Sequence, residues 1–196
     1  MVSSSFSRTA GRGARLTIAL LLSLATSLSA TLLEKVEFDQ LCQKADLVVV
    51  GRCSAQECVW DRSHTTILTV YTFAVSETVK GRAVPSVRVT TLGGIIGDQG
   101  QGVAGSPRFK EGDEYVLFLE PEPEAGWRCK GWTQGCYAVL TDPTTRVKTV
   151  RGDTTGVSLV GKGSSKLEEG QPGKPMGLSS FLDAVRGHAA AKREAK

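Results

Sequence analysis

Histidine is scarce in this sequence, and the cysteine spacing used for metal or redox chemistry is missing. Only His64 and His188 are present, and the five cysteines form no C-x-x-C pair. Zinc clusters and thiol redox couples are built from such residues at close spacing. The sequence therefore predicts no metal site and no cofactor.

Signatures of phosphate binding and of serine hydrolysis are missing as well. The segment Gly93–Pro107 holds six glycines, but no Lys-Ser or Lys-Thr follows them and no G-x-G-x-x-G opens a helix. No G-x-S-x-G elbow occurs, and the spacing of Asp61 and His64 does not support a catalytic triad. We expect Asp61 and His64 in a hairpin turn, and we expect no catalytic residues.

A strong excess of positive charge is absent from most of the chain. The sequence has 24 basic and 20 acidic residues, and Arg8, Arg12 and Arg15 all belong to the first 30 positions. The remainder is close to neutral and gives no electrostatic reason to expect nucleic acid as a partner. Its length suits one domain with its own core.

No apolar run is long enough to span a membrane. The run Leu16–Leu28 covers thirteen residues, whereas a spanning helix needs about 20. Three arginines precede it and small residues follow, which is the order of a secretory signal peptide. We predict a signal over residues 1–30, cut between Ser27 and Ala30, and a periplasmic or extracellular protein without a stable membrane span. An uncleaved membrane anchor is the alternative.

All five cysteines lie after the predicted signal. Exported proteins meet oxidising conditions, so disulfides are expected, and an odd count leaves one thiol over. Cys129 and Cys136 flank a turn-rich segment and form the first expected pair. Cys53 with Cys58 is the preferred second pair, which leaves Cys42 alone.

Most of the sequence has the composition of β-strands. Residues of high β propensity alternate with polar ones between glycine and proline, which predicts a mainly β fold, a small sandwich or barrel. The expected strands are Leu47–Val50, Thr65–Val79, Val84–Thr91, Tyr115–Leu119, Trp127–Trp132, Tyr137–Leu140 and Arg146–Val150.

Helical spacing occurs near both ends of the predicted domain. Apolar residues at near-helical intervals predict a short helix over Leu33–Lys44, within a domain of residues 31–151. Residues 152–176 are rich in Gly, Ser and Lys and predict a flexible linker. Residues 177–196 then predict an amphipathic C-terminal helix that docks on the β domain, with a loosely bound tail as the alternative.

The glycine-rich segment is the leading candidate for a recognition surface, because binding residues often lie on loops of a rigid scaffold. The expected ligand is a protein or glycan outside the cytoplasm. The candidate residues are Gly93, Gly94, Ile95, Ile96, Asp98, Gln99 and Gln101.

A second short motif is Arg151-Gly152-Asp153, which spells an adhesion tripeptide. Three-residue matches arise easily by chance, and Gly-Asp is ordinary turn chemistry. We interpret it as a turn.

A set of scaffold motifs gives the chain a family resemblance over roughly residues 45–140. The motifs are Ala45–Gly51, Thr78–Gly81, Leu92–Gly94, Gly105–Phe109, Gly112–Leu119 and Gly131–Gly135. The sequence resembles a widespread group of exported bacterial proteins without established activity. That resemblance implies a small closed or partly open OB-like β-barrel, similar in outline to the inhibitory domain of tissue inhibitors of metalloproteinases.

The resemblance to those inhibitors carries no inhibitory residue over to this chain. They chelate the protease zinc through a cysteine at the mature N-terminus, whereas the first cysteine here, Cys42, lies well inside the expected mature chain. The leading hypothesis is an exported, non-enzymatic binding or accessory module. A secreted protease inhibitor is the first alternative, and a secreted hydrolase is the second.

Overall fold

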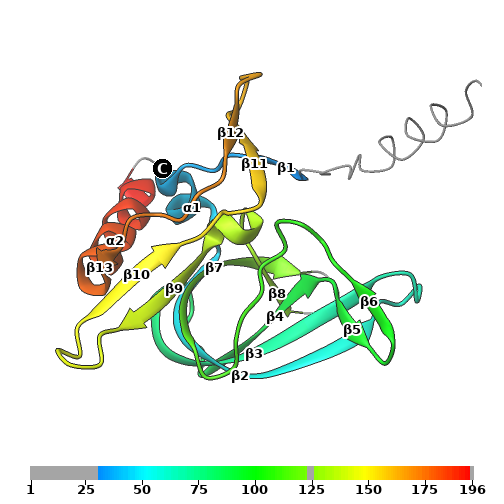
Figure 1. The fold of residues 1–196 in the computed structure, drawn as a ribbon. Coiled ribbons are helices and arrows are strands. Elements are labelled where there is room, and N and C mark those ends of the chain that lie inside the picture. The colour runs from blue at the N-terminus through cyan, green and yellow to red at the C-terminus, as the bar shows by residue number, and fades with distance from the viewer. Residues whose placement is uncertain (1–30, 123–125, 195–196) are drawn as a thin grey trace, which may run out of the picture.

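The computed structural model describes residues 31–122 and 126–194, so the predicted signal peptide lies outside the described residues. The fold is mainly β with a C-terminal helix, as predicted (Figure 1). The strands are β1 (Thr31–Glu34), β2 (Leu47–Trp60), β3 (Ile67–Lys80), β4 (Ser86–Leu92), β5 (Gly94–Ile96), β6 (Gln99–Gln101), β7 (Glu114–Glu122), β8 (Gly126–Cys129), β9 (Cys136–Thr141), β10 (Lys148–Gly152), β11 (Val157–Val160), β12 (Leu167–Glu169) and β13 (Met176–Gly177). The helices are α1 (Phe38–Lys44), the 3-10 turn η1 (Trp132–Gly135) and α2 (Leu178–Glu194).

Strand β7 separates two hydrophobic cores. Its residues Val116 and Phe118 belong to one core, and Leu117 and Leu119 belong to the other. Successive side chains of a strand point to opposite faces, so a strand buried on both faces is apolar throughout. The first half of β2 alternates between the same two cores. These two strands therefore form the shared wall of the molecule.

Five strands are joined in a ring by their hydrogen bonds. The strand order β7-β2-β3-β4-β8 closes because β8 pairs with β7 as well as with β4. The β4–β8 contact is parallel, between Val89 and Trp127, and the other pairings in the ring are antiparallel. The β2–β3 ladder is interrupted by three register shifts, and such bulges bend and twist a strand pair. The second core lies among these strands.

The segment predicted as a flexible linker instead contains two strands. β11 pairs in parallel with β1 and antiparallel with β12, so residues from both ends of the domain form a separate three-stranded sheet. Val157 is 3 % exposed and Leu159 is 9 % exposed. They alternate with period two, a strand pattern that the surrounding Gly, Ser and Lys concealed. The linker prediction is therefore wrong for this stretch.

The helix predicted over Leu33–Lys44 is correct only in its second half. β1 ends at Glu34 and α1 begins at Phe38. Leu33 is a strand residue because β11 offers a partner for β1, a contact with residues more than 120 positions away. The apolar spacing within α1 buries Leu41 and Cys42 in the first core.

The predicted C-terminal helix is present as α2. Its residues Phe181, Leu182 and Val185 are buried in the first core together with residues of α1, β2, β7 and β10. Figure 1 shows α2 beside α1, away from the end of the molecule where β5 and β6 lie. No helix within the described ranges has the length and apolar character to cross a membrane.

The predicted disulfides are not formed, and all five cysteines are free thiols. Cys53 and Cys58 lie five residues apart in β2, where extended chain separates the Cα atoms by about 16 Å. A bridge needs about 4.4–6.8 Å, so this pairing is wrong. The thiols of Cys129 and Cys136 do interact. The pKa of Cys136 is raised mainly by burial and secondly by its hydrogen bond with Cys129. They nevertheless lie beyond bonding distance.

Candidate ligand-binding site

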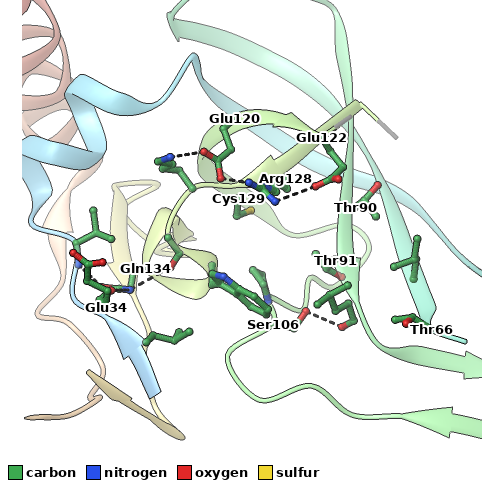
Figure 2. Close-up of a pocket in the computed structure, with 18 of the residues that line it drawn as sticks. Glu34, Thr66, Thr90, Thr91, Ser106, Glu120, Glu122, Arg128, Cys129 and Gln134 are labelled. Carbon is green, nitrogen blue, oxygen red and sulfur yellow. Dashed lines mark hydrogen bonds and ion pairs between the residues drawn. The ribbon is translucent and has the colours of Figure 1, made fainter. Parts of the chain in front are cut away.

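A cavity of about 600 Å³ lies where the ends of β3, β4 and β7 meet β1 and η1. We call it the main cavity. Figure 2 shows Glu120, Arg128 and Glu122 in a row on one side, Thr91 and Ser106 on another, and Glu34 with Gln134 opposite. The volume falls in the range of about 300–1,000 Å³ that small ligands use. Its lining residues are Leu33, Glu34, Val36, Asp61, Thr66, Leu68, Thr90, Thr91, Leu92, Ser106, Pro107, Glu120, Glu122, Arg128, Cys129, Lys130, Gly131, Trp132 and Gln134.

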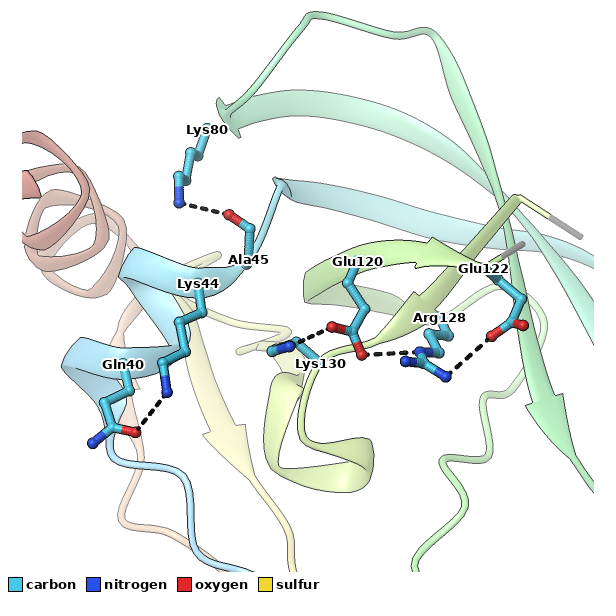
Figure 3. Close-up of polar contacts among 8 residues, drawn as sticks. All are labelled: Gln40, Lys44, Ala45, Lys80, Glu120, Glu122, Arg128 and Lys130. Atoms are coloured by element: carbon cyan, nitrogen blue, oxygen red, sulfur yellow. Dashed lines mark hydrogen bonds and ion pairs between the residues drawn. The ribbon is translucent and has the colours of Figure 1, made fainter. Parts of the chain in front are cut away.

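The charged row alternates acid and base across β7 and β8 (Figure 3). Arg128 donates through Nε to Glu120 at 2.9 Å and lies 3.5 Å from Glu122, while Lys130 forms a short ion pair with Glu120. The pairing of Glu120 with Arg128 across the two strands places these side chains on one face. Burial raises the pKa of Glu120, but the hydrogen bond and charge of Lys130 and the charge of Arg128 outweigh it and lower the pKa overall.

The aromatic wall of the cavity is Trp132, which is held in an unusual backbone conformation. Its φ is 60°, in the left-handed region, and the residue is 37 % exposed. A bulky residue is a genuine outlier in that region. The preceding Gly131 has φ 69°, so two successive residues are left-handed at the start of η1. Such strain is concentrated at ligand-binding and catalytic sites.

The other end of this turn requires a glycine for lack of space. A Cβ on Gly135 would lie 2.1 Å from the carbonyl oxygen of Lys130. Lys130 is itself held because its N–H donates to the carbonyl of Phe118 at 2.8 Å. The motif Gly131–Gly135 therefore folds into a compact turn that presents Trp132 at the cavity.

Gln134 connects this turn to β1. Its side-chain Nε2 donates to the carbonyl of Glu34 at 2.9 Å, and its Oε1 accepts the N–H of Val36 at 2.9 Å. Gln134 is buried, and both bonds span about 100 residues of sequence. The wall formed by Glu34 is consequently held in a defined position relative to Trp132.

Two hydroxyl side chains of the cavity lining, Thr91 and Ser106, are hydrogen-bonded to main-chain carbonyls. Ser106 donates to the carbonyl of Leu92 at 2.7 Å, and Thr91 donates to the carbonyl of Thr69 at 3.5 Å. These bonds direct the hydroxyl protons toward protein carbonyls and leave oxygen lone pairs as acceptors. This side can therefore accept hydrogen bonds from a ligand.

Asp61 and His64 lie in the turn between β2 and β3, as the sequence predicts. The Asp61 carboxylate accepts the Ser63 hydroxyl at 2.7 Å and the N–H groups of Thr65 and Thr66 at 2.8 and 3.1 Å. The Ser63 bond, followed by the Thr66 N–H, lowers the pKa of Asp61 to about 2. The His64 ring instead packs against Trp60, with centroids 6.4 Å apart. Asp61 therefore orders a turn and does not orient His64.

The glycine-rich segment is a two-stranded hairpin and not an irregular loop. β5 pairs with β6 around the turn Gly97–Asp98. Gln101 fixes its base, since its Oε1 accepts the N–H of Ile67 at 2.6 Å and its Nε2 donates to the carbonyl of Thr65 at 3.0 Å. Glycine is needed at position 94 because its φ is 149° and a Cβ would lie 2.7 Å from Thr69 Oγ1.

The hairpin borders a second cavity, of about 540 Å³. Four of the seven predicted loop residues line it, together with Cys58 and Arg108 among others. The four are Gly93, Gly94, Ile95 and Gln101. The remaining three, Ile96, Asp98 and Gln99, lie toward the tip of the hairpin, outside the lining of that cavity.

The tripeptide Arg151-Gly152-Asp153 is not a turn. Arg151 and Gly152 end strand β10, and Asp153 forms an isolated bridge with Pro172. The Asp153 carboxylate accepts the N–H of Thr155 at 2.9 Å, and the side-chain hydrogen bond with Thr155, followed by this N–H, lowers the pKa of Asp153. The carboxylate therefore caps the turn that follows the strand.

No protein-family model matches the chain, and no curated protein matches it either. Within the described residues, no group of three or more histidine, cysteine or acidic side chains could hold a metal ion.

Most of the main cavity was missed by sequence reasoning. Trp132 and Gln134 belong to the scaffold motif Gly131–Gly135, and Glu120 and Glu122 are not among the predicted site residues. The signal that could have located them is the period-two spacing of Glu120 and Glu122, repeated by Arg128 and Lys130, with Trp132 following at once after Gly131. The glycine-rich segment is adjacent to the site, since Ser106 and Pro107 line the same cavity.

Proposed function

We propose that this protein is an exported, non-enzymatic binding module on a partly open OB-type barrel, and that its ligand, a protein or glycan, occupies the main cavity. The strand order β7-β2-β3-β4-β8 with a parallel β4–β8 contact supports the barrel. OB-type barrels bind ligands across their second and third strands and two adjacent loops. The corresponding elements here are β3, β4 and the turn at Asp61, all of which contribute to the cavity.

The observation that carries the proposal is the strained aromatic residue at the cavity. Trp132 is partly exposed in a left-handed conformation that costs free energy. A glycine there would adopt φ 60° without that steric cost, so backbone conformation does not explain the choice of a tryptophan. A binding role for the indole explains this, because aromatic rings supply large and rigid contact surfaces.

A non-enzymatic role is supported by the placement of the general acid–base candidates. His64 packs on Trp60 at the end of a hairpin, and the Asp61 oxygens accept hydrogen bonds from its own turn. The carboxylates of Glu120 and Glu122 in the cavity are joined to Arg128 and Lys130. Ion pairs of this kind favour recognition over proton transfer, because the neighbouring cations stabilise the ionised form of each carboxylate.

The test compares ligand capture by variants of the cavity and of a distant surface. The purified protein is immobilised and offered a glycan array and a displayed peptide library. Trp132→Gly removes the indole and leaves the backbone conformation accessible, and Val147→Ala alters an exposed apolar residue of another surface. We expect Trp132→Gly to lose capture at least tenfold and Val147→Ala to retain it. Equal capture by both variants would contradict the proposal.

A further inference from the structure

The lining of the main cavity carries an excess of negative charge. Arg128 and Lys130 are its two cations, and both are paired with the β7 carboxylates. Glu34 and Asp61 also line the cavity, and no ion pair among the described residues joins a cation to either of them. A ligand with phosphate or carboxylate groups would meet repulsion, and a cationic group would be attracted.

The lining of the cavity includes an aromatic residue, Trp132, and an acidic residue, Glu34. Gln134 joins the turn that carries Trp132 to the strand that carries Glu34, through bonds of 2.9 Å at both ends. Lysine and arginine side chains bind indole faces within about 6 Å, most strongly where water is excluded. This pair of groups is suited to an ammonium or guanidinium group.

The strand that carries Glu34 has an edge that no described strand pairs with, and Gln134 bonds to that edge at Glu34 and Val36 but not at Leu32. β1 lies at the end of its sheet, and among the described residues no strand pairs with its other side. The N–H of Lys35 donates toward β11, to the carbonyl of Val160 at 2.8 Å. Alternation along a strand therefore directs the N–H and C=O of Leu32 away from β11. Extended peptides add to such edges through main-chain hydrogen bonds.

We propose, on the basis of the function proposed above, that the main cavity binds an extended peptide segment through one lysine or arginine side chain. The peptide backbone adds to the free edge of β1 beside Leu32. The cationic side chain enters the cavity, where Glu34 supplies the opposing charge and Trp132 supplies the aromatic face. The negative charge of the cavity selects a cationic side chain. The strand edge requires an extended peptide backbone whose N–H groups are free to donate hydrogen bonds.

The test uses four synthetic peptides with blocked ends. The first has the sequence Thr-Val-Lys-Val-Thr, the second carries Glu in place of Lys, and the third carries norleucine. The fourth keeps Lys but has N-methyl groups on both valines, which removes the donors that a strand edge needs. Binding is measured by calorimetry and by quenching of tryptophan fluorescence. We expect the first peptide to bind, and each of the other three to bind at least tenfold more weakly.

Two protein variants assign the interaction to the cavity. Glu34→Gln keeps the size of the side chain and removes its charge, so we expect at least tenfold weaker binding of the first peptide and a weaker dependence on salt. Glu169→Gln alters an exposed carboxylate on β12, outside the cavity lining, and we expect it to bind as the wild type does. Trp132→Gly should abolish the fluorescence change.

The possible failures of this proposal are distinguishable. Equal binding of the lysine and norleucine peptides, or full binding by Glu34→Gln, would overturn the cationic recognition. Capture of a β-linked glucose tetrasaccharide by wild type and not by Trp132→Gly, with no peptide bound, would overturn the peptide and keep the proposed function. Loss of neither ligand in Trp132→Gly would overturn both.

Discussion

At the scale of single residues, the cavity depends on side chains whose position is set by an unusual backbone or by a saturated polar group. Trp132 has left-handed backbone dihedrals, and Gln134 is buried with both ends of its amide bonded. Asp61 orders the turn on the opposite side through accepted hydrogen bonds. The roles of Trp132 and Asp61 can therefore be tested by stability and titration measurements without a ligand.

The backbone strain at Trp132 predicts an unusual order of stability. Trp132→Gly and Trp132→Ala remove the same ring contacts, but only glycine adopts φ 60° without steric cost. We expect the glycine variant to be more stable than the alanine variant by about 1 kcal/mol in urea unfolding. The reverse order would show that the left-handed conformation is not maintained in solution.

The turn at Asp61 predicts a transition in acid. Because its pKa is lowered from 3.8 to about 2, the carboxylate stabilises the folded turn fully above pH 4, and this contribution is lost as the pH falls toward 2. The amide chemical shifts of Thr65 and Thr66 should therefore titrate with a midpoint near 2. Asp61→Asn should remove that titration, whereas Asp98→Asn should leave it unchanged. A midpoint at the ordinary aspartate value would contradict the hydrogen bonds.

At the scale of elements, short segments are held by single polar side chains from distant strands. α1 has only seven residues, too few to be stable alone. Lys80, at the end of β3, caps the C-terminal end of α1. Its ammonium donates to the carbonyls of Cys42, Gln43 and Ala45 at 2.8, 3.0 and 2.6 Å. Figure 3 shows the contact of Lys80 with Ala45. A cation at a helix C-terminus also complements the helix dipole.

The role of Lys80 predicts that its loss weakens the fold through α1. We expect Lys80→Met to lower the free energy of unfolding by about 2–3 kcal/mol, because three carbonyls lose a charged donor, and to increase hydrogen exchange in α1. Lys44→Met is the matched control, since its ammonium makes a 3.4 Å bond to Gln40 on the surface. A cost below about 0.5 kcal/mol in both variants would show that water replaces Lys80.

The hairpin β5–β6 predicts different effects at its base and its tip. Gln101→Ala removes two bonds to the start of β3, and we expect it to lower the free energy of unfolding by about 1–2 kcal/mol. Gln99→Ala, near the exposed tip, should cost less than about 0.5 kcal/mol. Thermal unfolding of the two variants measures the difference, and equal melting temperatures would mean that the hairpin is not anchored at its base.

At the scale of the whole molecule, two cores share the walls β2 and β7, so damage to one reaches the other. Phe118 is fully buried in the first core, with its ring centroid 5.7 Å from Tyr137 and 6.3 Å from Phe181. Its neighbours Leu117 and Leu119 face the second core. The helices and the strand ring are therefore expected to unfold as one unit.

This coupling predicts a large effect of truncating Phe118. We expect Phe118→Ala to lower the free energy of unfolding by about 3–5 kcal/mol, in a single transition seen by both far-ultraviolet circular dichroism and tryptophan fluorescence. Leu140 is 44 % exposed, so Leu140→Ala should cost less than about 1 kcal/mol. Two separate transitions for Phe118→Ala would show that the cores are independent.

The elements predicted correctly from sequence are those whose pattern is local. β7 was expected from its apolar run at Tyr115–Leu119, and α2 from the spacing of Phe181, Leu182 and Val185. The errors occur where a segment becomes a strand only because a distant strand of the same chain pairs with it. Leu33 fits a helix as well as a strand, and Val157 is surrounded by residues typical of a linker, until β1 and β11 pair.

The sequence by itself determined the mainly β class, the C-terminal helix and the approximate position of most strands, because alternation and helical spacing are properties of neighbouring residues. Only the tertiary structure determined which residues come together to line the main cavity. Glu34, Trp132 and Glu122 belong to three segments that meet through the Gln134 bonds and the closure of β8 onto β4 and β7. Contacts between residues far apart in sequence depend on this packing, which no local pattern encodes.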